Sequence, residues 1–431
     1  MTSTPSRRAV LTWLAASPLA AAAACGSGSK SSDKKKSGAP EKASLTVFWW
    51  GGPDRAKRTQ NALDMYHTQH PEVSFTYQWQ GYAGYYDKLS TNAAGGQVPD
   101  LFQIDDNLLT EYAERRLTLD LGPYVGRQLS VTDFSPGLKQ YGTVQGKFVA
   151  VAAAQNTPGL IYDKTLLSGA GLPTPQIGWS WQQYADWAKQ VTTATGKYGT
   201  TDPSADYKVL QDWLRQQGKD LYKNGRMGFT ETDLARWFTF WANLRKDKVG
   251  PPGDISHVAN GGDVTKQLVV TKQAATSFMH DNQLTEMSND TDHELGVTAY
   301  PGKPSGQFHR AALFWSAYAH TKHPKVVASV IDFLVNDAGA GTILGAERGL
   351  PVNLKVRKQL ESTFDPVTKR VIEFEAQMAT KVGKAPSPPP KGHQQIRNLL
   401  ITAAETVEYD RASPQQAASQ FLDQAKTALQ G

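Results

Sequence analysis

Strand-like and helix-like segments alternate over residues 45–116, and this alternation restricts the chain to a small group of folds. Residues 45–50, LTVFWW, form an apolar run that stops at a Gly-Gly-Pro turn signal, as a buried strand does. Residues 73–80 alternate apolar and polar side chains with the period of two that a strand requires. Strands that alternate with helices predict an α/β fold containing a parallel sheet. The expected elements are strands at 45–50, 73–80 and 101–104 and helices at 54–70 (with Asp54 as N-cap), 87–94 and 107–116.

The remaining strand and helix patterns make the chain larger than one hydrophobic core serves. Ser180 and Gln183 form a capping-box signature, and Ser413 precedes a proline that begins the last helix. The roughly 388 residues from position 44 onward exceed the usual size of a single core, so we expect two lobes. Further strands are expected at 146–151, 159–162, 273–279, 295–300 and 311–319, and helices at 180–192, 203–218, 230–247, around 326–334 and over most of 365–430, with a proline-rich break at 384–390.

The N-terminus carries an export signal. Arg7 and Arg8 precede an uncharged apolar run over 10–24, which is too short to span a bilayer as a helix. The sequence Ala-Ala-Ala-Cys that ends at Cys25 resembles a lipobox, and the paired arginines resemble a twin-arginine signal. We therefore expect residues 1–24 to be cleaved, by the twin-arginine or the general secretory route, and Cys25 to carry lipid that includes palmitate. The alternative of an ordinary buried cysteine is disfavoured, because the flanking segments have no core-forming pattern.

Residues 25–43 follow as a linker rich in Gly, Ser and Lys, a composition that favours a flexible chain. The chain has a net charge of +6, but most of this charge lies in the signal and the linker. The folded part is close to neutral, so nucleic acid is not an expected partner. Cys25 is the only cysteine, so no disulfide is expected despite the exported location.

Catalytic and cofactor motifs are missing from the sequence. There is no Gly-x-Ser-x-Gly elbow, no phosphate loop and no Gly-x-Gly-x-x-Gly fingerprint. The histidine pairs at 67/70 and 320/323 lack the spacing and the glutamate of a metalloprotease helix. Adjacent acids such as Asp105 and Asp106 poorly satisfy the two separated carboxylates of a glycosidase. We therefore expect a binding protein with no metal and no cofactor, although a catalytic pair assembled in space is invisible to such a scan.

Aromatic and polar residues gather at the expected carboxyl ends of strands, where open α/β sheets bind ligands. An aromatic ring covers the C–H face of a sugar, and Asp, Asn, Gln and Arg side chains bond its hydroxyl groups. Trp49 alone is better explained as core. The clusters are Trp49-Trp50, 82–86, Asp105-Asp106, Gln155-Asn156, 280–283 and 310–315.

Several short motifs, taken in order, resemble those of the family 1 extracellular solute-binding proteins, the carbohydrate receptors of ABC importers. The resemblance covers essentially residues 44–430. Its motifs are FWWGG at 48–52, AAGGxxPDL at 93–101, LDLxPYV at 119–125, YDK at 162–164, AGLPxP at 170–175, HP at 323–324 and DFLVND at 332–337.

The resemblance implies a two-lobed, periplasmic-binding-protein-like α/β fold, with a mostly parallel sheet flanked by helices in each lobe and hinge strands between them. It implies one lobe at 44–152 plus 312–350 and the other at 153–311 plus 351–431. It also implies sugar contacts from Trp50, Tyr82, Asp105, Asn156, His280, Asp281, Asn282, Gln283, Trp315 and Arg348.

The function that follows is an extracytoplasmic receptor, held at the outer face of the cell membrane by the lipid on Cys25. The resemblance implies a monomer that closes on a mono- or oligosaccharide and delivers it to ABC permease subunits. Two alternatives stay open at this point: an exported enzyme that acts on glycans, and a surface adhesion protein.

Overall fold

The computed structural model describes residues 41–82, 84–259 and 263–429. The expected signal at 1–24, Arg7, Arg8, Cys25 and the linker up to residue 40 lie outside the described residues. The unit described here therefore begins at Glu41.

The first sheet has five strands in the order β2-β1-β3-β12-β6. β1 (Ala43–Trp50) pairs in parallel with β2 (Val73–Gln80) and β3 (Leu101–Ile104). β12 (Arg310–Ala317) lies antiparallel between β3 and β6 (Val151–Asn156). Four of these strands therefore point the same way, and the carboxyl ends of β1, β3 and β6 meet at one edge of the sheet.

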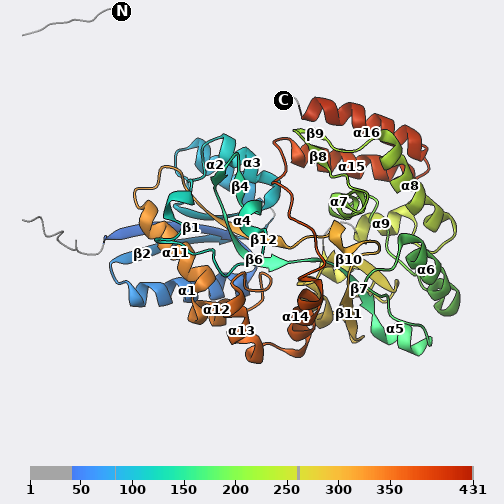
Figure 1. Ribbon diagram of the computed structural model, residues 1–431, viewed down its shortest axis with the longest axis horizontal. Coiled ribbons are helices and arrows are strands. Elements are labelled where there is room, and N and C mark those ends of the chain that lie inside the picture. The colour runs from blue at the N-terminus through green and yellow to red at the C-terminus, as the bar shows by residue number, and fades with distance from the viewer. Residues whose placement is uncertain (1–40, 83, 260–262, 430–431) are drawn as a thin grey trace, which may run out of the picture. The chain divides into compact units, whose positions relative to one another are not determined.

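Helices flank this sheet, and their apolar faces close the first hydrophobic core (Figure 1). They are α1 (Pro53–Gln69), α2 (Tyr85–Ala94), α3 (Asp106–Glu114), α4 (Leu138–Tyr141), α11 (Pro324–Asn336), α12 (Ala338–Leu344) and α13 (Leu354–Leu360). The fully buried side chains of the core come from residues 43–152 and 308–352. Trp49 is completely buried among them, as expected for a core residue.

The second sheet has three strands in the order β10-β7-β11, and all its pairs are antiparallel. β10 (Thr276–His280) and β11 (Leu295–Thr298) are joined through α10 (Gln283–Asn289) and run parallel to each other. β7 (Pro158–Asp163) enters between them from the first sheet and runs the opposite way. The expectation of a mostly parallel sheet therefore holds for the first lobe and is wrong for the second.

A second hydrophobic core lies around this sheet and under the helices that surround it. These helices are α5 (Lys164–Gly169), α6 (Trp181–Thr195), α7 (Tyr207–Arg215), α8 (Glu231–Lys246), α9 (Gly253–Ala259), α14 (Pro366–Met378), α15 (His393–Glu408) and α16 (Pro414–Ala428). Two short hairpins complete the fold, β4 (Thr143–Val144) with β5 (Lys147–Phe148) and β8 (Tyr222–Lys223) with β9 (Arg226–Met227).

The chain passes directly from one sheet to the other. Only Thr157 separates β6 from β7, so the first connection between the sheets is a nearly continuous strand (Figure 1). The second passage precedes Arg310, where β12 returns to the first sheet. After Leu350, which exchanges two backbone hydrogen bonds with Gln155, the chain leaves again towards α14.

Local capping explains where several elements begin. The capping boxes at Ser180 and Ser413 are present, as expected. The expected N-cap at Asp54 is wrong: Gly52 occupies that position and Pro53 follows it, which places Asp54 inside the first turn, where its charge still favours the helix dipole. α7 is shorter than expected because the Asp206 carboxylate accepts the backbone N–H of Lys208 and so caps the helix late.

The segment expected as one strand at 146–151 is divided into β5 and the start of β6. Gly146, with φ of +79°, belongs to the tight turn that pairs β5 with β4. Within the residues that the structure describes, no single helix is both long and apolar enough to cross a membrane, and only α11 and α12 taken together, bent by 69°, reach that measure.

Candidate functional site

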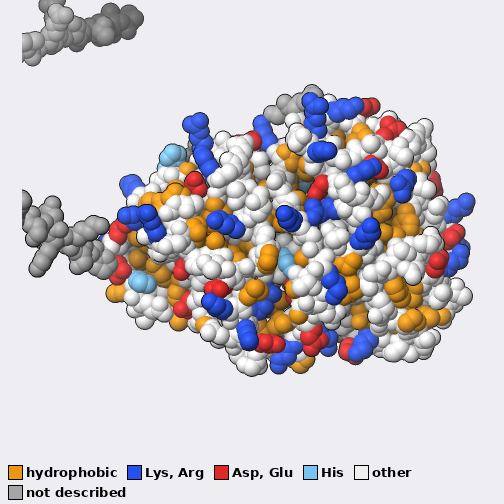
Figure 2. Space-filling view, viewed as in Figure 1, with side chains coloured by type: hydrophobic (Ala, Val, Ile, Leu, Met, Phe, Trp, Pro, Cys, Tyr) orange, Lys and Arg blue, Asp and Glu red, His pale blue; other side chains and the backbone are white. Residues whose placement is uncertain are grey.

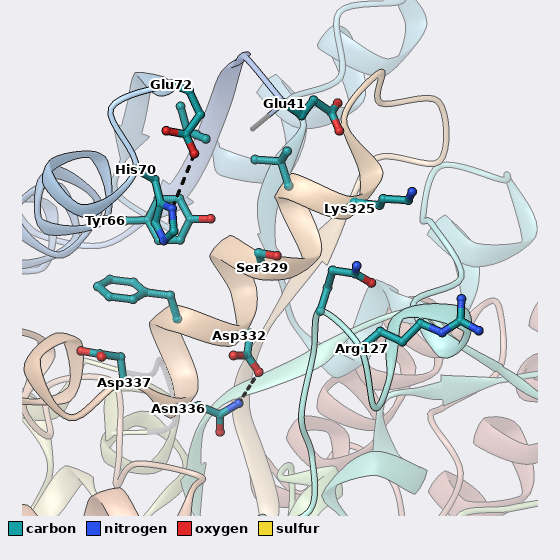
Figure 3. A pocket seen from close by; sticks show the side chains of 14 residues that line it. Glu41, Tyr66, His70, Glu72, Arg127, Lys325, Ser329, Asp332, Asn336 and Asp337 are labelled. Atoms are coloured by element: carbon teal, nitrogen blue, oxygen red, sulfur yellow. Dashed lines mark hydrogen bonds and ion pairs between the residues drawn. The ribbon is translucent and has the colours of Figure 1, made fainter. Parts of the chain in front are cut away.

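Two large cavities occur at opposite ends of the first lobe. The larger, of about 680 Å³, lies beside the amino ends of β1 and β2, between α1 and α11 (Figure 3). Tyr66 and Phe333 form its apolar floor, and acidic side chains dominate its rim. The amino ends of parallel strands are not where open α/β sheets bind ligands. We therefore take the second cavity, of about 470 Å³, as the candidate site.

The candidate cavity is lined from both lobes. Asp106, Tyr141 and Arg310 come from α3, α4 and β12 around the first sheet. Tyr207 and Gln211 come from α7, which packs in the second core, and the β8–β9 hairpin adds its own residues. A third wall is the segment 384–390, here called the proline strap, of which residues 386–390 line the cavity.

Arg310 is held rigidly on the first-lobe side. Its Nη2 donates to Asp106 Oδ2 at 2.7 Å and to the Tyr141 hydroxyl oxygen at 3.0 Å. The Tyr141 hydroxyl in turn donates to Asp106. All three side chains are buried, and the guanidinium also lies 4.9 Å from the centre of the Phe308 ring. Arg310 Nη1 is buried and makes no hydrogen bond.

This arrangement fixes the charge state of the pair. Burial alone would raise the pKa of Asp106, but Arg310, Lys208 and the hydrogen bond from Tyr141 outweigh it and hold that pKa well below its usual range. Burial opposes the charge of Arg310 as well, and Tyr141 and Asp106 together raise its pKa above the usual value. The two side chains therefore form a buried ion pair whose net charge is close to zero.

The second-lobe wall consists of tyrosines with fixed hydroxyl groups. The Tyr207 hydroxyl donates to Asn107 Oδ1 at 2.9 Å, and this bond joins α7 to α3 of the first lobe. The Tyr222 hydroxyl lies 2.5 Å from His393 Nδ1. His393 also packs edge-on against the Tyr207 ring, with ring centres 4.6 Å apart. Gln211 Nε2 donates to Asp220 Oδ1 at 2.8 Å, so the polar groups of this wall support one another.

The proline strap crosses from α14 to α15 and contacts both lobes. The Thr110 hydroxyl on α3 donates to the carbonyl oxygen of Pro389. Arg215 Nη2 on α7 donates to the carbonyl oxygen of Lys384. Because proline has no N–H group, the four prolines of the strap offer the cavity carbonyl acceptors and apolar rings only.

The residues expected to bind ligand fall into three groups, and none of them lines this cavity. The first group is Trp50, Tyr82 and Asp105, next to the cavity residue Asp106. The Tyr82 hydroxyl donates to Asp105 Oδ2 at 2.8 Å, and its ring meets the Trp50 ring edge-on at 5.6 Å. Tyr82 is 50% exposed, so this group presents an accessible aromatic surface at the strand ends. Burial and the neighbouring Asp106 raise the pKa of Asp105.

The second group is Asn156 with the segment from His280 to Gln283. Asn156 Nδ2 donates to Asn282 Oδ1 at 3.2 Å, and Gln283 Oε1 accepts the backbone N–H of His280. Asp281 is fully buried and accepts the backbone N–H of Thr157, the residue between the two sheets. Burial and the nearby Glu375 raise the pKa of Asp281. Asp281 therefore supports the connection between the lobes from inside.

The third group is Trp315 and Arg348. Trp315 is only 2% exposed, and the Arg348 guanidinium lies 5.7 Å from its ring centre. Arg348 is also buried and donates to the Thr59 hydroxyl at 2.6 Å. The two side chains border a separate cavity of about 30 Å³, which is too small for a sugar. The expectation that Trp315 offers a free stacking face is therefore wrong in this conformation, because Arg348 covers the ring.

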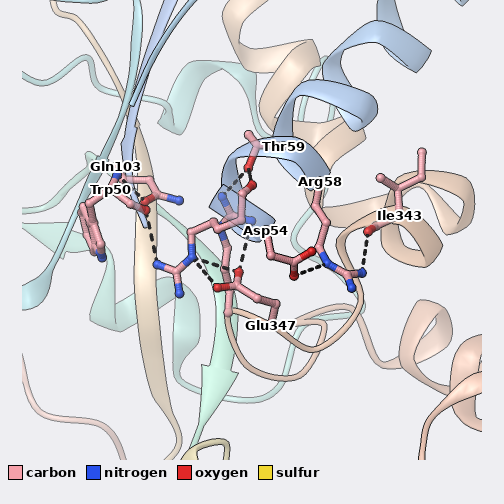
Figure 4. A network of polar contacts seen from close by, with 9 residues as sticks. Trp50, Asp54, Arg58, Thr59, Gln103, Ile343 and Glu347 are labelled. Carbon is pink, nitrogen blue, oxygen red and sulfur yellow. Dashed lines mark hydrogen bonds and ion pairs between the residues drawn. The ribbon is translucent and has the colours of Figure 1, made fainter. Parts of the chain in front are cut away.

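A polar network joins the first and third groups (Figure 4). Arg55 donates to the carbonyl oxygen of Trp50 at 3.3 Å and to Glu347 Oε1 at 2.7 Å. Gly51 makes this possible: its φ is +151°, and a Cβ there would lie 2.2 Å from Arg55 Cδ. The conformation and the close approach therefore both require glycine at this position.

Sequence reasoning found the neighbourhoods of Asp106 and Arg310, since both follow or begin an expected strand. It missed Tyr141, Tyr207 and Gln211, which lie inside helices, and the proline strap, which it treated as a break. Their signal lies in tertiary contacts. Among the residues that the structure describes, no group of three or more His, Cys, Asp or Glu side chains is placed to hold a metal ion.

The two lobes, the strand-like connection between them and the cavity where they meet define a solute-binding protein. The chain matches the model of the family "Bacterial extracellular solute-binding protein" over residues 61–369, and it belongs to that family. The resemblance stated from the sequence motifs is thereby confirmed.

Individual relatives cover nearly the whole chain. An "Uncharacterized lipoprotein in oleD 5'region" of Streptomyces antibioticus is 27% identical over 394 residues, which are 87% of this chain and 85% of the relative. The "Extracellular solute-binding protein family 1" of Alicyclobacillus acidocaldarius is 28% identical, with a TM-score of 0.74 over 91% of this chain and all of its own. A periplasmic oligogalacturonide-binding protein of Yersinia enterocolitica, solved with saturated digalacturonic acid, has a TM-score of 0.76 at 23% identity and covers 90% of this chain and 99% of its own. These structures share the two-lobed α/β fold.

Proposed function

We propose that this protein is the extracytoplasmic sugar receptor of an ABC importer and that the sugar binds in the 470 Å³ cavity. The observation that carries the proposal is the lining: aromatic rings and fixed polar groups from both lobes face one space, at the edge of the first sheet where the parallel strands end. The Yersinia enterocolitica structure, whose title names an oligogalacturonide ligand, supports a carbohydrate as the class of ligand.

The proposed mechanism is capture by closure. Ligand enters between separated lobes, and closure brings α7 and the proline strap onto α3. The bonds from Tyr207 to Asn107 and from Thr110 to Pro389 are those of the closed form. Ligand contacts that exist only after closure would shift the population towards that form. The closed receptor, a monomer, then docks on the permease subunits.

We place the lobe boundaries at the passages between the sheets, which lie at Thr157, just before Arg310 and beyond Leu350. These positions are a few residues from the boundaries expected at 152/153, 311/312 and 350/351. The composition of the two hydrophobic cores supports this division, because residues 43–152 and 308–352 supply the first core.

Anchoring through a lipid on Cys25 remains part of the proposal, as do export through the signal with Arg7 and Arg8 and a location at the outer face of the membrane. The name of the Streptomyces antibioticus relative, a lipoprotein, supports it. On the face shown in Figure 2, Lys and Arg side chains are interspersed with Asp and Glu side chains, which supports a partner other than nucleic acid.

The Trp50, Tyr82 and Asp105 group borders the cavity through Asp106, so we propose that it extends the site for a ligand longer than one ring. His280, Asn282, Gln283 and Asn156 form the other border, at the first passage between lobes. We propose that Asp281 and Arg348 act by positioning their neighbours, because both are buried.

The test is calorimetric titration of the purified receptor with a panel of mono- and oligosaccharides, followed by chromatography of the recovered ligand. We expect binding of at least one saccharide, which is recovered intact. Tyr207→Ala should weaken that binding at least tenfold, whereas Tyr409→Ala, at a surface tyrosine that is 40% exposed, should not. A cleaved saccharide would support the exported-enzyme alternative, and no binding by a folded receptor would support the adhesion protein.

A further inference from the structure

The charges and donors of the cavity lining indicate which sugars it accepts. Resting on the proposed function, we propose that the ligand is an uncharged, hydroxyl-rich saccharide and that the cavity discriminates against uronates and sugar phosphates. The solved relative from Yersinia enterocolitica holds an acidic disaccharide, so this inference separates the present chain from a protein of the same fold.

The first observation is that the cation in the described lining is already neutralised. Arg310 is paired with Asp106 at 2.7 Å, and its Nη2 atom is fully engaged with Asp106 and Tyr141. An anionic ligand binds arginine best through two parallel N–H donors, which requires a free guanidinium edge. To obtain that edge, an anion would have to displace a buried carboxylate.

The second observation is that the lining contains a second carboxylate and no second free cation. Asp220 lines the cavity and is paired with Arg215 at 2.7 Å. Lys208 is half-buried nearby, with its Nζ 5.8 Å from the centre of the Tyr207 ring, but it stands behind the lining. Burial and the neighbouring Arg310 lower the pKa of Lys208, which further weakens it as an anion partner.

The third observation is the donor and acceptor character of the proline strap. Its prolines have carbonyl oxygens and lack N–H groups. A sugar hydroxyl donates to such a wall and lays the C–H face of its ring against the pyrrolidine rings. A carboxylate or phosphate has no proton to donate and meets the negative ends of the carbonyl dipoles. The wall therefore favours hydroxyl groups over anionic groups.

The polar groups that remain are suited to hydroxyls as well. The hydroxyls of Tyr141 and Tyr207 donate to protein oxygens, which leaves their own oxygen lone pairs as acceptors. The Gln211 amide donates to Asp220, and its oxygen is likewise an acceptor. Three sides of the cavity thus present acceptors, and a polyol is the class of ligand that supplies many donors.

The experiment compares matched ligands on the wild-type receptor. For each saccharide of the panel, the neutral sugar, the corresponding uronate and the 6-phosphate are titrated calorimetrically at low and at high salt. We expect the neutral member to bind at least tenfold more tightly, about 1.4 kcal/mol, and its affinity to be unchanged by salt. A uronate or phosphate that binds as tightly as its neutral counterpart overturns this inference and leaves the proposed function standing.

A variant provides a second readout. Asp106→Asn frees the Arg310 guanidinium while keeping the shape of the side chain, so the preference for the neutral member should fall by at least tenfold. Asp54→Asn, at an exposed aspartate outside the cavity, should leave the preference unchanged. An unaltered preference in folded Asp106→Asn overturns the inference; if this variant does not fold, the wild-type comparison decides. If no member of any set binds, the proposed function fails and this inference with it.

Discussion

Acid should weaken the fold through one histidine in the wall of the cavity. His393 is 1% exposed, and its Nε2 atom is buried without a hydrogen bond. Burial, together with Arg310, Arg397 and Lys208, lowers the pKa of His393 from 6.5 to about 4, against the opposing effect of Asp106. The folded protein therefore keeps this imidazole neutral at pH values where the unfolded chain has already protonated it.

The sign of the effect follows from this lowered pKa. The contribution of His393 is fully present above pH 6.5 and is lost as the pH falls towards the folded pKa of about 4. A shift of this size corresponds to about 3 kcal/mol of unfolding free energy, at roughly 1.4 kcal/mol per pKa unit. Between about pH 7.5 and about pH 4, unfolding of the wild-type protein should become easier by at least that amount, because His280 has a lowered pKa as well.

Urea unfolding at a series of pH values measures this directly, with His393→Gln compared with wild type. Glutamine does not titrate, so the variant should lose about 3 kcal/mol of the acid sensitivity. His70→Gln, at a side chain that is 46% exposed, is the matched control and should keep the wild-type profile. Identical pH profiles for His393→Gln and wild type would refute the reasoning.

Three further predictions concern the core, the connection between lobes and the N-terminus. Trp315→Ala should lower the unfolding free energy by about 3–5 kcal/mol, because the buried ring leaves a cavity, whereas Trp79→Ala, at a ring that is 41% exposed, should cost far less; equal shifts in melting temperature would contradict this. Glu375→Gln should cost about 2–4 kcal/mol in urea unfolding near neutral pH, since the carboxylate accepts hydrogen bonds from Gln155 at 2.6 Å and Thr157 at 2.7 Å. Exposed Glu373→Gln on the same helix is its control, and a similar cost for both variants would disprove the role of the buried carboxylate. Cys25→Ser should leave the protein unprocessed or released to the medium, as cell fractionation and mass spectrometry would report; a variant that stays processed and membrane-bound would argue against the lipid anchor.

Local pattern predicted much of the first lobe, because its strands follow simple rules. Residues 73–80 alternate in sequence and form β2 with the expected bounds. The run at 45–50 is a buried strand flanked on both sides, so its apolar character alone identified it. The direction of strands in the second sheet was not predictable in the same way. β7 enters that sheet from the first one, and no periodicity records where a strand has come from.

The site was predicted by neighbourhood more than by residue. Asp105 was expected to bind and Asp106 lines the cavity, because Asp105 caps α3 and directs its neighbour inwards. Trp315 shows the limit of the method: alternation identifies the face of a strand but not which side chain from elsewhere covers it, and here that side chain is Arg348. Tyr207 and Pro389 belong to the cavity only because distant parts of the chain meet.

The position of β12 between β3 and β6 bears on how the polypeptide is synthesised and folded. β12 begins at Arg310, long after β6 ends at Asn156, so the ribosome completes most of the second lobe before the central partner of the first sheet exists. Until then β3 and β6 each have an unpaired edge, and such edges invite association with other chains. The contacts that close the sheet are far apart in sequence, which favours slow folding. We therefore expect the nascent chain to depend on chaperones that shield strand edges until residue 317 has emerged.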